Sequence, residues 1–195
     1  MAGIHSRARS FDWLAEAYER ARPGWPAAAI DALVQRLALD ERSTVLDLAA
    51  GTGKLTRELV PRFATVIAVE PLDGMRAVLE RVVPGARAVA GTAEAIPLED
   101  ASVDAVVASE AFHWFDPEPA VAEMARVLRP GGGVAALYNR YVPPPERWHE
   151  ELRMVFEAHR LPSDDIDAFD VRPWTQALAA HFPDVREDEF DPVPV

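Results

Sequence analysis

The residues with the clearest chemistry are two carboxylates on either side of a glycine-rich turn. Asp47 lies near the end of a short apolar run, the turn Gly51-Thr52-Gly53 follows it, and Glu70 ends the next apolar run. Backbone N–H groups in a turn between a strand and a helix point toward a ligand. An acid about 20 residues after the first glycine is typical of a partner for ribose hydroxyls. The spacing therefore predicts a site for a ligand that contains a ribose.

Three kinds of cofactor can use such a turn. A Walker A phosphate loop fails at two positions, because Leu48 and Leu55 stand where it requires Gly and Ser or Thr. A dinucleotide fingerprint requires a third glycine where Thr56 stands. Asp47 would repel a pyrophosphate and favour a cation, such as the ammonium of a methionine moiety, either directly or by orienting the loop. With a ribose partner at Glu70 and no phosphate, these residues indicate S-adenosylmethionine.

The segment at 45–56, VLDLAAGTGKLT, resembles motif I of the class I S-adenosylmethionine-dependent methyltransferases, of the type 11 kind. Four further segments resemble, in the same order, that family's second-strand segment, its adenine loop, its fourth strand and the turn before its fifth strand. These segments are 66–75, 91–98, 103–115 and 123–132. The resemblance implies the fold of that family and methyl transfer as the activity.

The resemblance and the strand ends together indicate which residues bind the cofactor. The resemblance implies that Glu70 takes the ribose hydroxyls and that the loop at 91–98 brackets the adenine. Ala49 stands where the family has the first glycine of its motif, and Met75 fits either core packing or contact with the adenine. The predicted cofactor-binding residues are Asp47, Ala49, Gly51, Thr52, Gly53, Glu70, Met75, Thr92, Ala93, Glu94, Ser109 and Glu110.

The resemblance also extends to an acceptor site. His113-Trp114, with Tyr18 and Arg22 near the start, is similar to a small-molecule subgroup that includes trans-aconitate methyltransferases. Methyl transfer from an activated donor needs alignment more than acid–base chemistry, and a carboxylate acceptor needs no base. His113 carries an imidazole, which exchanges protons near neutral pH, so it is the predicted catalytic residue. The predicted substrate residues are Tyr18, Arg22, His113, Trp114 and Arg140, and no metal site is predicted.

Apolar runs alternate with amphipathic helical patterns, and this alternation positions the two carboxylates. The predicted strands are 44–49, 65–70, 87–90, 103–108 and 134–138. The predicted helices are 11–21, 26–39, 54–63, one containing Met75, Val78 and Leu79, 120–128, 147–160 and 172–181. Near-continuous apolar strands that alternate with helices form a parallel sheet covered on both faces. The predicted fold is therefore α/β, a Rossmann-like doubly wound and mostly parallel sheet whose ligands bind beyond the carboxyl ends of the strands.

The length of 195 residues fits a single methyltransferase domain over 1–195. Within it we expect an N-terminal helical lid at 1–40, a cofactor-binding core at 41–140, and C-terminal helices with an edge strand at 141–195. The family's sheet has seven strands, of which the last two form an antiparallel edge, and only 185–190 is a candidate for the sixth. We therefore expect either a truncated chain, whose incomplete antiparallel edge would leave the fifth strand exposed, or a sheet that is completed in a different way.

The composition excludes several classes of partner. The chain has 20 Lys and Arg against 32 Asp and Glu, a formal net charge of −12, and no cysteine. The acid excess argues against nucleic-acid and anionic-membrane surfaces, and the lack of cysteine excludes disulfides and thiolate metal sites. We expect a cytoplasmic enzyme, monomeric or a weak homodimer, that uses S-adenosylmethionine and a small-molecule acceptor. An inactive, cofactor-binding module of the methyltransferase type and an NAD-type oxidoreductase remain as alternatives.

Overall fold

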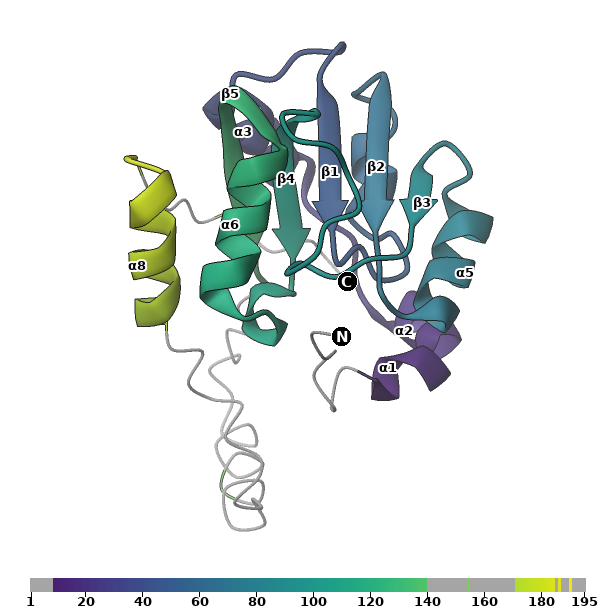
Figure 1. The fold of residues 1–195 in the computed structure, drawn as a ribbon. Helices are drawn as coiled ribbons and strands as arrows, with labels where there is room; N and C mark the ends of the chain where they lie inside the picture. Colours follow the sequence, from purple (N-terminus) through teal and green to yellow (C-terminus); the bar gives the residue numbers. More distant parts are fainter. Residues whose placement is uncertain (1–8, 140–153, 155–170, 185, 187–189, 191–195) are drawn as a thin grey trace.

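The strands form one sheet in the computed structural model, which describes residues 9–139, 154, 171–184, 186 and 190. The strands are β1 (Thr44–Leu48), β2 (Thr65–Val69), β3 (Arg87–Val89), β4 (Val103–Ser109) and β5 (Leu128–Leu137). Their order is β3-β2-β1-β4-β5, and every neighbouring pair is parallel (Figure 1). The predicted Rossmann-like sheet is confirmed. Its strand order reverses between β1 and β4, which is where ligands bind in such sheets.

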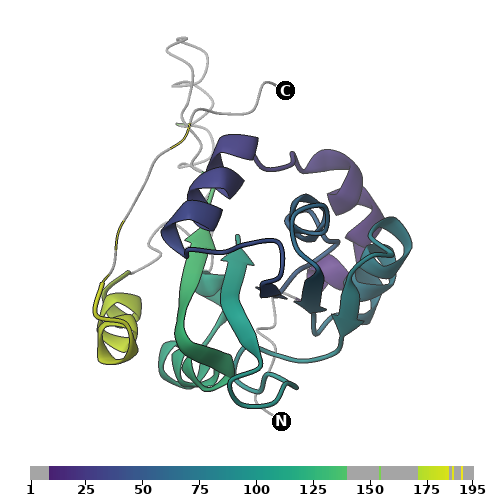
Figure 2. The ribbon, with the colours of Figure 1, turned by 90° about the horizontal axis from the view of Figure 1, so that it is seen from above.

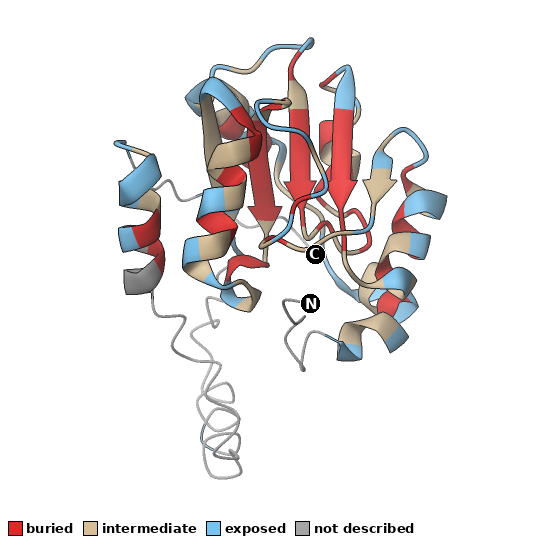
Figure 3. Cartoon of the chain, in the orientation of Figure 1, coloured by how far each residue is buried: buried red, intermediate tan, exposed pale blue. Residues whose placement is uncertain are grey.

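Helices cover both faces of the sheet (Figure 2). As a result, β1, β2 and β4 are buried along most of their length (Figure 3). One face carries α3 (Ala27–Arg36), α4 (Thr56–Leu59) and α5 (Asp73–Val82), and the other carries α6 (Pro117–Val127) and α8 (Val171–His181). Alternate residues of β1 belong to the two cores, since Val45 shares a cluster with Ile30 of α3 and Leu46 shares one with Met124 of α6. A strand buried on both faces reads as an uninterrupted apolar run.

Two short helices, α1 (Ser10–Trp13) and α2 (Ala15–Ala21), lie toward the end of the sheet to which the strand arrows point (Figure 1). The sequence predicted one helix over 11–21, but Leu14 breaks it with a φ of −104° and a ψ of 8°. Asp12 Oδ1 accepts a hydrogen bond from the Gly74 N–H at 2.6 Å, and Ala15 packs with Met75. The N-terminal helices are thus held against α5, beside the strand ends.

Several predicted boundaries are wrong: α6 begins three residues before its predicted start, and α3 ends three residues before its predicted end. The helix predicted over 54–63 is regular only in α4, and turns flank it on both sides. β5 begins before the predicted turn, because that turn is built into the strand as an irregularity. Leu128 pairs with Val103, and the next pair joins Gly133 to Ala105, so the intervening residues bulge out of the register. The remaining strands begin where they were predicted and end within one residue of their predicted ends.

The end of the chain contributes α8, which confirms the helix predicted over 172–181. Trp174 of α8 is buried against Phe112, with 4.5 Å between the ring centroids. The helix predicted over 147–160 and the strand predicted over 185–190 fall almost entirely outside the described residues, so the antiparallel edge stays a prediction. Within the described part of the chain, β5 is the outermost strand on its side, and no helix there is long and apolar enough to cross a membrane.

Candidate functional site

The turn after β1 has a backbone that favours glycine. Ala49, Gly51 and Gly53 have φ angles of +56°, +57° and +85°, all in the left-handed region. A Cβ on Gly53 would lie 2.9 Å from the side chain of Val83 and 3.1 Å from that of Leu79, so this part of the turn also approaches α5 closely. Conformation therefore requires both glycines of the predicted Gly-x-Gly turn. Ala49 adopts the same conformation although it carries a methyl group.

Glu70 lies directly after β2 and is 4% exposed. Its Oε2 accepts a hydrogen bond from the Gly51 N–H at 2.8 Å, and its Oε1 accepts one from the Leu72 N–H at 2.8 Å. Burial raises the pKa of Glu70 to about 7, and the two N–H donors and the Arg76 guanidinium oppose this rise. The predicted pairing of the glycine turn with this carboxylate is therefore a direct contact between the ends of β1 and β2.

Asp47, near the end of β1, is fully buried. Its Oδ2 accepts a hydrogen bond from the Thr56 hydroxyl at 2.6 Å, and its Oδ1 has no hydrogen-bond partner among the described residues. Burial raises the pKa of Asp47 to about 7, and the Thr56 hydroxyl opposes this rise. The bond to Thr56 joins the two ends of the glycine turn. This contact fits the orienting role that the sequence left open for Asp47, and the direct role stays a prediction.

Glu19 of α2 joins the N-terminal helices to the glycine turn. Its Oε2 accepts a hydrogen bond from the Thr52 hydroxyl at 2.7 Å, and its Oε1 pairs with Arg57 at 2.6 Å and with Lys54 at 3.5 Å. Sequence reasoning missed Glu19, whose contacts leave the side chain of Lys54 only 16% exposed. No local pattern announces a contact between residues that lie 33 positions apart.

Aromatic rings continue from the N-terminal helices to the loop after β4. The ring of Phe11 lies 5.7 Å from that of Tyr18 and 6.1 Å from that of Trp114, and the Arg22 guanidinium lies 5.4 Å from the Tyr18 centroid. Burial raises the pKa of Tyr18, and nearby carboxylates that include Glu110 add to the rise. The structure therefore brings Tyr18, Arg22 and Trp114, together with its neighbour His113, to the same edge as the predicted cofactor residues, which is four of the five predicted substrate residues.

The end of β4 contributes Ser109 and Glu110, as predicted. Glu110 has a φ of +53°, its N–H donates to the Leu137 carbonyl at 2.9 Å, and its Oε1 accepts from the Asn139 N–H at 2.7 Å. His113 follows in a short 3-10 helix, η1 (Phe112–Trp114), where it is exposed. Its ring lies 4.5 Å from that of Trp114 and 6.2 Å from that of Tyr138. Arg140 lies outside the described residues.

The loop after β3 carries the three residues predicted on the adenine side. Thr92 forms an isolated bridge with Ala95, and its buried hydroxyl has no hydrogen-bond partner among the residues that the structure describes. Ala93 is buried in the core, and Glu94 Oε1 accepts a hydrogen bond from the Asp116 N–H at 3.0 Å. The loop is thus packed against the sheet and tied to the residue that precedes α6.

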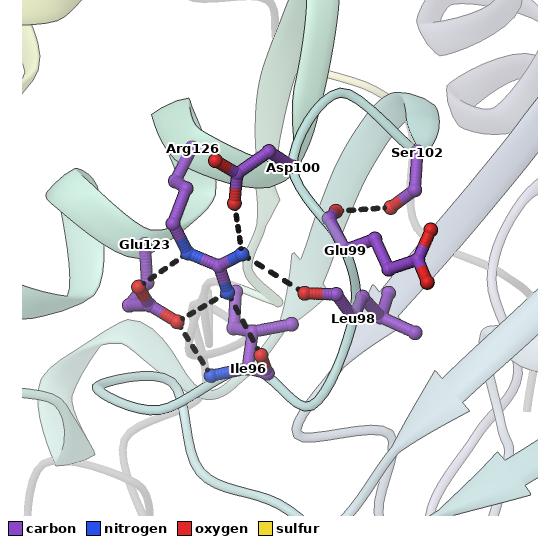
Figure 4. A network of polar contacts seen from close by, with 7 residues as sticks. All are labelled: Ile96, Leu98, Glu99, Asp100, Ser102, Glu123 and Arg126. Carbon is purple, nitrogen blue, oxygen red and sulfur yellow. Dashed lines mark hydrogen bonds and ion pairs between the residues drawn. The ribbon is translucent and has the colours of Figure 1, made fainter.

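A network that sequence reasoning missed holds the rest of this loop (Figure 4). The guanidinium of Arg126 binds the carboxylates of Glu123 and Asp100 and the backbone carbonyls of Ile96 and Leu98. Glu123 Oε2 also accepts a hydrogen bond from the Ile96 N–H at 2.8 Å. The charges of Glu123 and Asp100 raise the pKa of Arg126 above its usual range, and the Arg126 guanidinium lowers that of Glu123.

Comparison with known proteins identifies a family and relatives of this chain. Residues 46–136 match the family model described as a methyltransferase domain. The chain is 51% identical over 130 residues to an uncharacterized methyltransferase of Mycobacterium tuberculosis, covering 67% of this chain and 52% of that one. Residues 46–136 therefore belong to the methyltransferase family. The chain is also 36% identical over 168 residues to an uncharacterized methyltransferase-like protein of Schizosaccharomyces pombe, covering 84% and 63% of the two chains.

A solved structure shares this fold. The S-adenosylmethionine-dependent methyltransferase of Aquifex aeolicus has a TM-score of 0.52 at 22% identity, over 66% of this chain and 77% of that one, which shows a shared fold. The chain spans about half the length of the first curated relative named above. The finer resemblance to trans-aconitate methyltransferases stays a prediction.

Met75, the remaining predicted cofactor residue, packs in a cluster with Phe11 and Tyr18 of the N-terminal helices. Met75 is 3% exposed and packs with Ala15 and Val78, so it supports the N-terminal helices. Of the two roles that the sequence left open for Met75, the structure shows the packing one. Among the described residues, no group of three or more His, Asp or Glu could hold a metal ion.

Proposed function

We infer that this methyltransferase binds S-adenosylmethionine beyond the carboxyl ends of β1 and β2 and transfers its methyl group to a small-molecule acceptor. The contact between the Gly51 N–H and Glu70 Oε2 supports this most directly, because it places a carboxylate and a glycine turn side by side at the strand ends. Each carboxylate oxygen has two lone pairs, and the N–H donors occupy one on each. The remaining lone pairs can accept the two hydroxyls of a ribose.

The chemistry of the donor set fits this cofactor. Asp47 and Glu70 are buried acids whose pKa values burial has raised, so a cation nearby would stabilise their charged forms. S-adenosylmethionine carries positive charge on its sulfur and its amino group, and it supplies an activated methyl group when bound. The residues that would hold it are Glu70 at the ribose, the turn around Gly51 at the amino-acid end, and the loop at 92–94 at the adenine.

The chain's own residues would act by alignment and by excluding water. Tyr18 and Phe11 from the N-terminal helices and Trp114 from η1 bring an aromatic wall to the strand ends. Glu110 adds a carboxylate at the same edge, held by the Asn139 N–H. His113 is exposed there, and its imidazole can accept the proton that a phenol or an amine acceptor must lose. A carboxylate acceptor would need no such step.

The proposed acceptor is a small molecule rather than a nucleic acid. The formal net charge of −12 disfavours approach to phosphate backbones. We place the protein in the cytoplasm, as a monomer or weak homodimer without membrane association. A second candidate is a module that binds the cofactor without transferring a methyl group. It would use the same contact between the Gly51 N–H and Glu70, which can serve cofactor binding whether or not an acceptor is methylated.

Titration calorimetry tests the binding half of the proposal. We expect S-adenosylhomocysteine to bind and NAD not to bind. Glu70→Ala should weaken binding by about 1–3 kcal/mol, the usual cost of losing a charge-assisted hydrogen bond. Glu80→Ala, which removes an exposed glutamate of α5, is the matched control and should bind like the wild type. NAD binding in place of S-adenosylhomocysteine, or unchanged affinity in Glu70→Ala, would contradict this assignment.

A transfer assay separates the enzyme from the inactive module. A labelled methyl donor is incubated with pools of small metabolites, and methylated products are sought. Products that form with the wild type and not with Glu70→Ala support the enzyme. Tight binding of S-adenosylhomocysteine without any product, in the chain and in a longer version of it, supports the inactive module.

A further inference from the structure

The loop between β3 and β4, residues 91–102, has little regular structure to set its shape. Its one described bridge joins Thr92 and Ala95. The loop also folds back tightly on itself, because a Cβ on Gly91 would lie only 2.5 Å from the ring of Pro97. Side chains outside the loop must therefore determine where its backbone lies, and α6 supplies them.

Arg126, near the end of α6, uses all of its donors on this loop and its neighbour Glu123. Nε and Nη2 donate to the two oxygens of Glu123 at 2.7 and 2.8 Å. Nη2 also donates to the Ile96 carbonyl at 2.9 Å, and Nη1 donates to the Leu98 carbonyl at 2.9 Å and to Asp100 Oδ1 at 2.6 Å. An arginine has five N–H donors in a planar fork, so this guanidinium is fully satisfied.

The other attachments follow the same helix. Glu94 accepts a hydrogen bond from the N–H of Asp116, the residue before α6, and Glu123 accepts one from the Ile96 N–H. The N–H groups of Ala101 and Ser102 donate to the carbonyls at the end of α6, at 3.0 and 2.8 Å. The loop therefore runs along α6 from its first turn to its last, and the Arg126 fork holds the middle of that path (Figure 4).

We propose that Arg126, together with Glu123, is a positioning residue for the adenine end of the cofactor site. It fixes the backbone at 96–100, and through that backbone it orients the segment 92–94, where the buried Thr92 hydroxyl has no partner among the described residues. The guanidinium thereby determines how tightly and how selectively the base is held. This inference rests on the proposed S-adenosylmethionine site.

Arg126→Lys is the main variant, because lysine keeps the charge but has three donors and no planar fork. Calorimetry on the full chain measures dissociation constants for S-adenosylhomocysteine and for S-inosylhomocysteine, in which hypoxanthine replaces adenine. We expect binding of S-adenosylhomocysteine to weaken about tenfold or more, and the preference for adenine over hypoxanthine to fall at least about threefold. Arg129→Lys is the matched control, since Arg129 pairs only with Asp104 in the described contacts, near the start of β4. It should change both quantities less than about twofold.

Glu123→Gln provides a second variant if Arg126→Lys does not fold, because it keeps the size of the side chain and removes the charge beneath the fork. The same loss of base preference is expected, with a smaller loss of affinity. Unchanged base preference in a cooperatively folded variant overturns the inference, even if affinity or stability falls, because a purely structural role would leave the preference intact. If the wild type binds no S-adenosylhomocysteine, the proposed function fails and takes this inference with it. Wild-type binding with unaffected variants overturns the inference alone.

Discussion

Asp47 and Glu70 lie at the carboxyl ends of the neighbouring strands β1 and β2, and their hydrogen bonds indicate different roles. Glu70 binds the N–H groups of Gly51 and Leu72, one on each oxygen, and keeps lone pairs for further donors. Asp47 binds the Thr56 hydroxyl and is closed off from solvent. In the proposed site, Glu70 therefore contacts the ligand, whereas Asp47 holds the glycine turn in the shape that the ligand needs.

Ala49 offers a test of that shape at a single residue. Its φ of +56° is a conformation in which an alanine is strained by about 1–2 kcal/mol, whereas glycine is not. Glycine loses more conformational entropy on folding, which offsets about 0.4–1 kcal/mol of the gain. We expect Ala49→Gly to raise the free energy of unfolding by about 0.5–1 kcal/mol, as measured by urea denaturation.

Ala64→Gly is the control for this prediction. Ala64 is exposed and has a negative φ, so glycine there relieves no strain and only adds entropy to the unfolded chain. The control should lose stability where Ala49→Gly gains it. A loss of similar size in both variants would show that the turn does not strain Ala49.

At the scale of elements, the N-terminal helices are attached at several points, and two of these bear on the proposed site. Glu19 of α2 binds the glycine turn through Thr52, and Asp12 of α1 accepts the N–H of Gly74 at the start of α5. Both attachments lie beside Glu70, so in the proposed site the helices would cover the cofactor. A change that loosens α1 should therefore also weaken ligand binding at the proposed site.

Gly74→Ala tests this coupling. The new Cβ would lie 2.4 Å from the Asp12 backbone oxygen and 2.8 Å from its Oδ1, so α1 must move away. Overpacking of this kind costs about 1–3 kcal/mol of stability. We also expect amide hydrogen exchange in residues 15–21 to accelerate and S-adenosylhomocysteine to bind more weakly. Mass spectrometry of exchanged peptides and calorimetry measure the two effects.

Gly24→Ala is the matched control, because its Cβ would come no closer than 3.9 Å to Glu58. It should leave the exchange of residues 15–21 unchanged. If Gly74→Ala accelerates exchange and leaves affinity unaltered, the helices do not cover the cofactor.

The sequence predicted the strands well and the side-chain network poorly, for a physical reason. A strand buried on both faces is visible as an apolar run, and the turn after β1 is visible because its backbone angles favour glycine. Glu19 and Arg126 act on segments that are distant in the chain, and their neighbours in sequence say nothing of those partners. Met75 was ambiguous because an apolar helix position looks the same whether a ligand or another helix covers it.

At the scale of the whole molecule, the parallel sheet is what brings the site together. Parallel strands end at one edge, so residues after β1, β2 and β4 meet there although they are far apart in sequence. The same arrangement buries two carboxyl groups near each other. In the described part of the chain, no cationic side chain counters the rise in the pKa of Asp47. Burial raises the pKa of each, and for Asp47 the charge of Glu70 adds to the rise. The stability of the whole fold should therefore depend on pH.

The direction follows from where the protons are bound. The pKa of Asp47 rises from 3.8 to about 7 in the folded state, and that of Glu70 rises from 4.5 to about 7. Between these limits the folded chain holds protons that the unfolded chain releases, so its stability falls as pH rises, by up to about 1.4 kcal/mol per pH unit for each group. Glu19, Asp104 and Glu123 have lowered pKa values and act in the opposite direction. Their contribution is present above their unfolded values and is lost only at lower pH.

Urea denaturation at pH 5, 6 and 7 measures this dependence on the ligand-free protein. We expect the free energy of unfolding to fall over this range in the wild type, and to fall less steeply in Asp47→Asn and in Glu70→Gln, because an amide does not titrate. S-adenosylhomocysteine, with its cationic amino group, should bind more tightly as pH rises, since it favours the ionised carboxylates that destabilise the empty fold. If the free energy of unfolding changes equally with pH in the wild type and in both variants, these two acids are not the source of the pH dependence. The expected effect of their charge on ligand affinity would then be wrong as well.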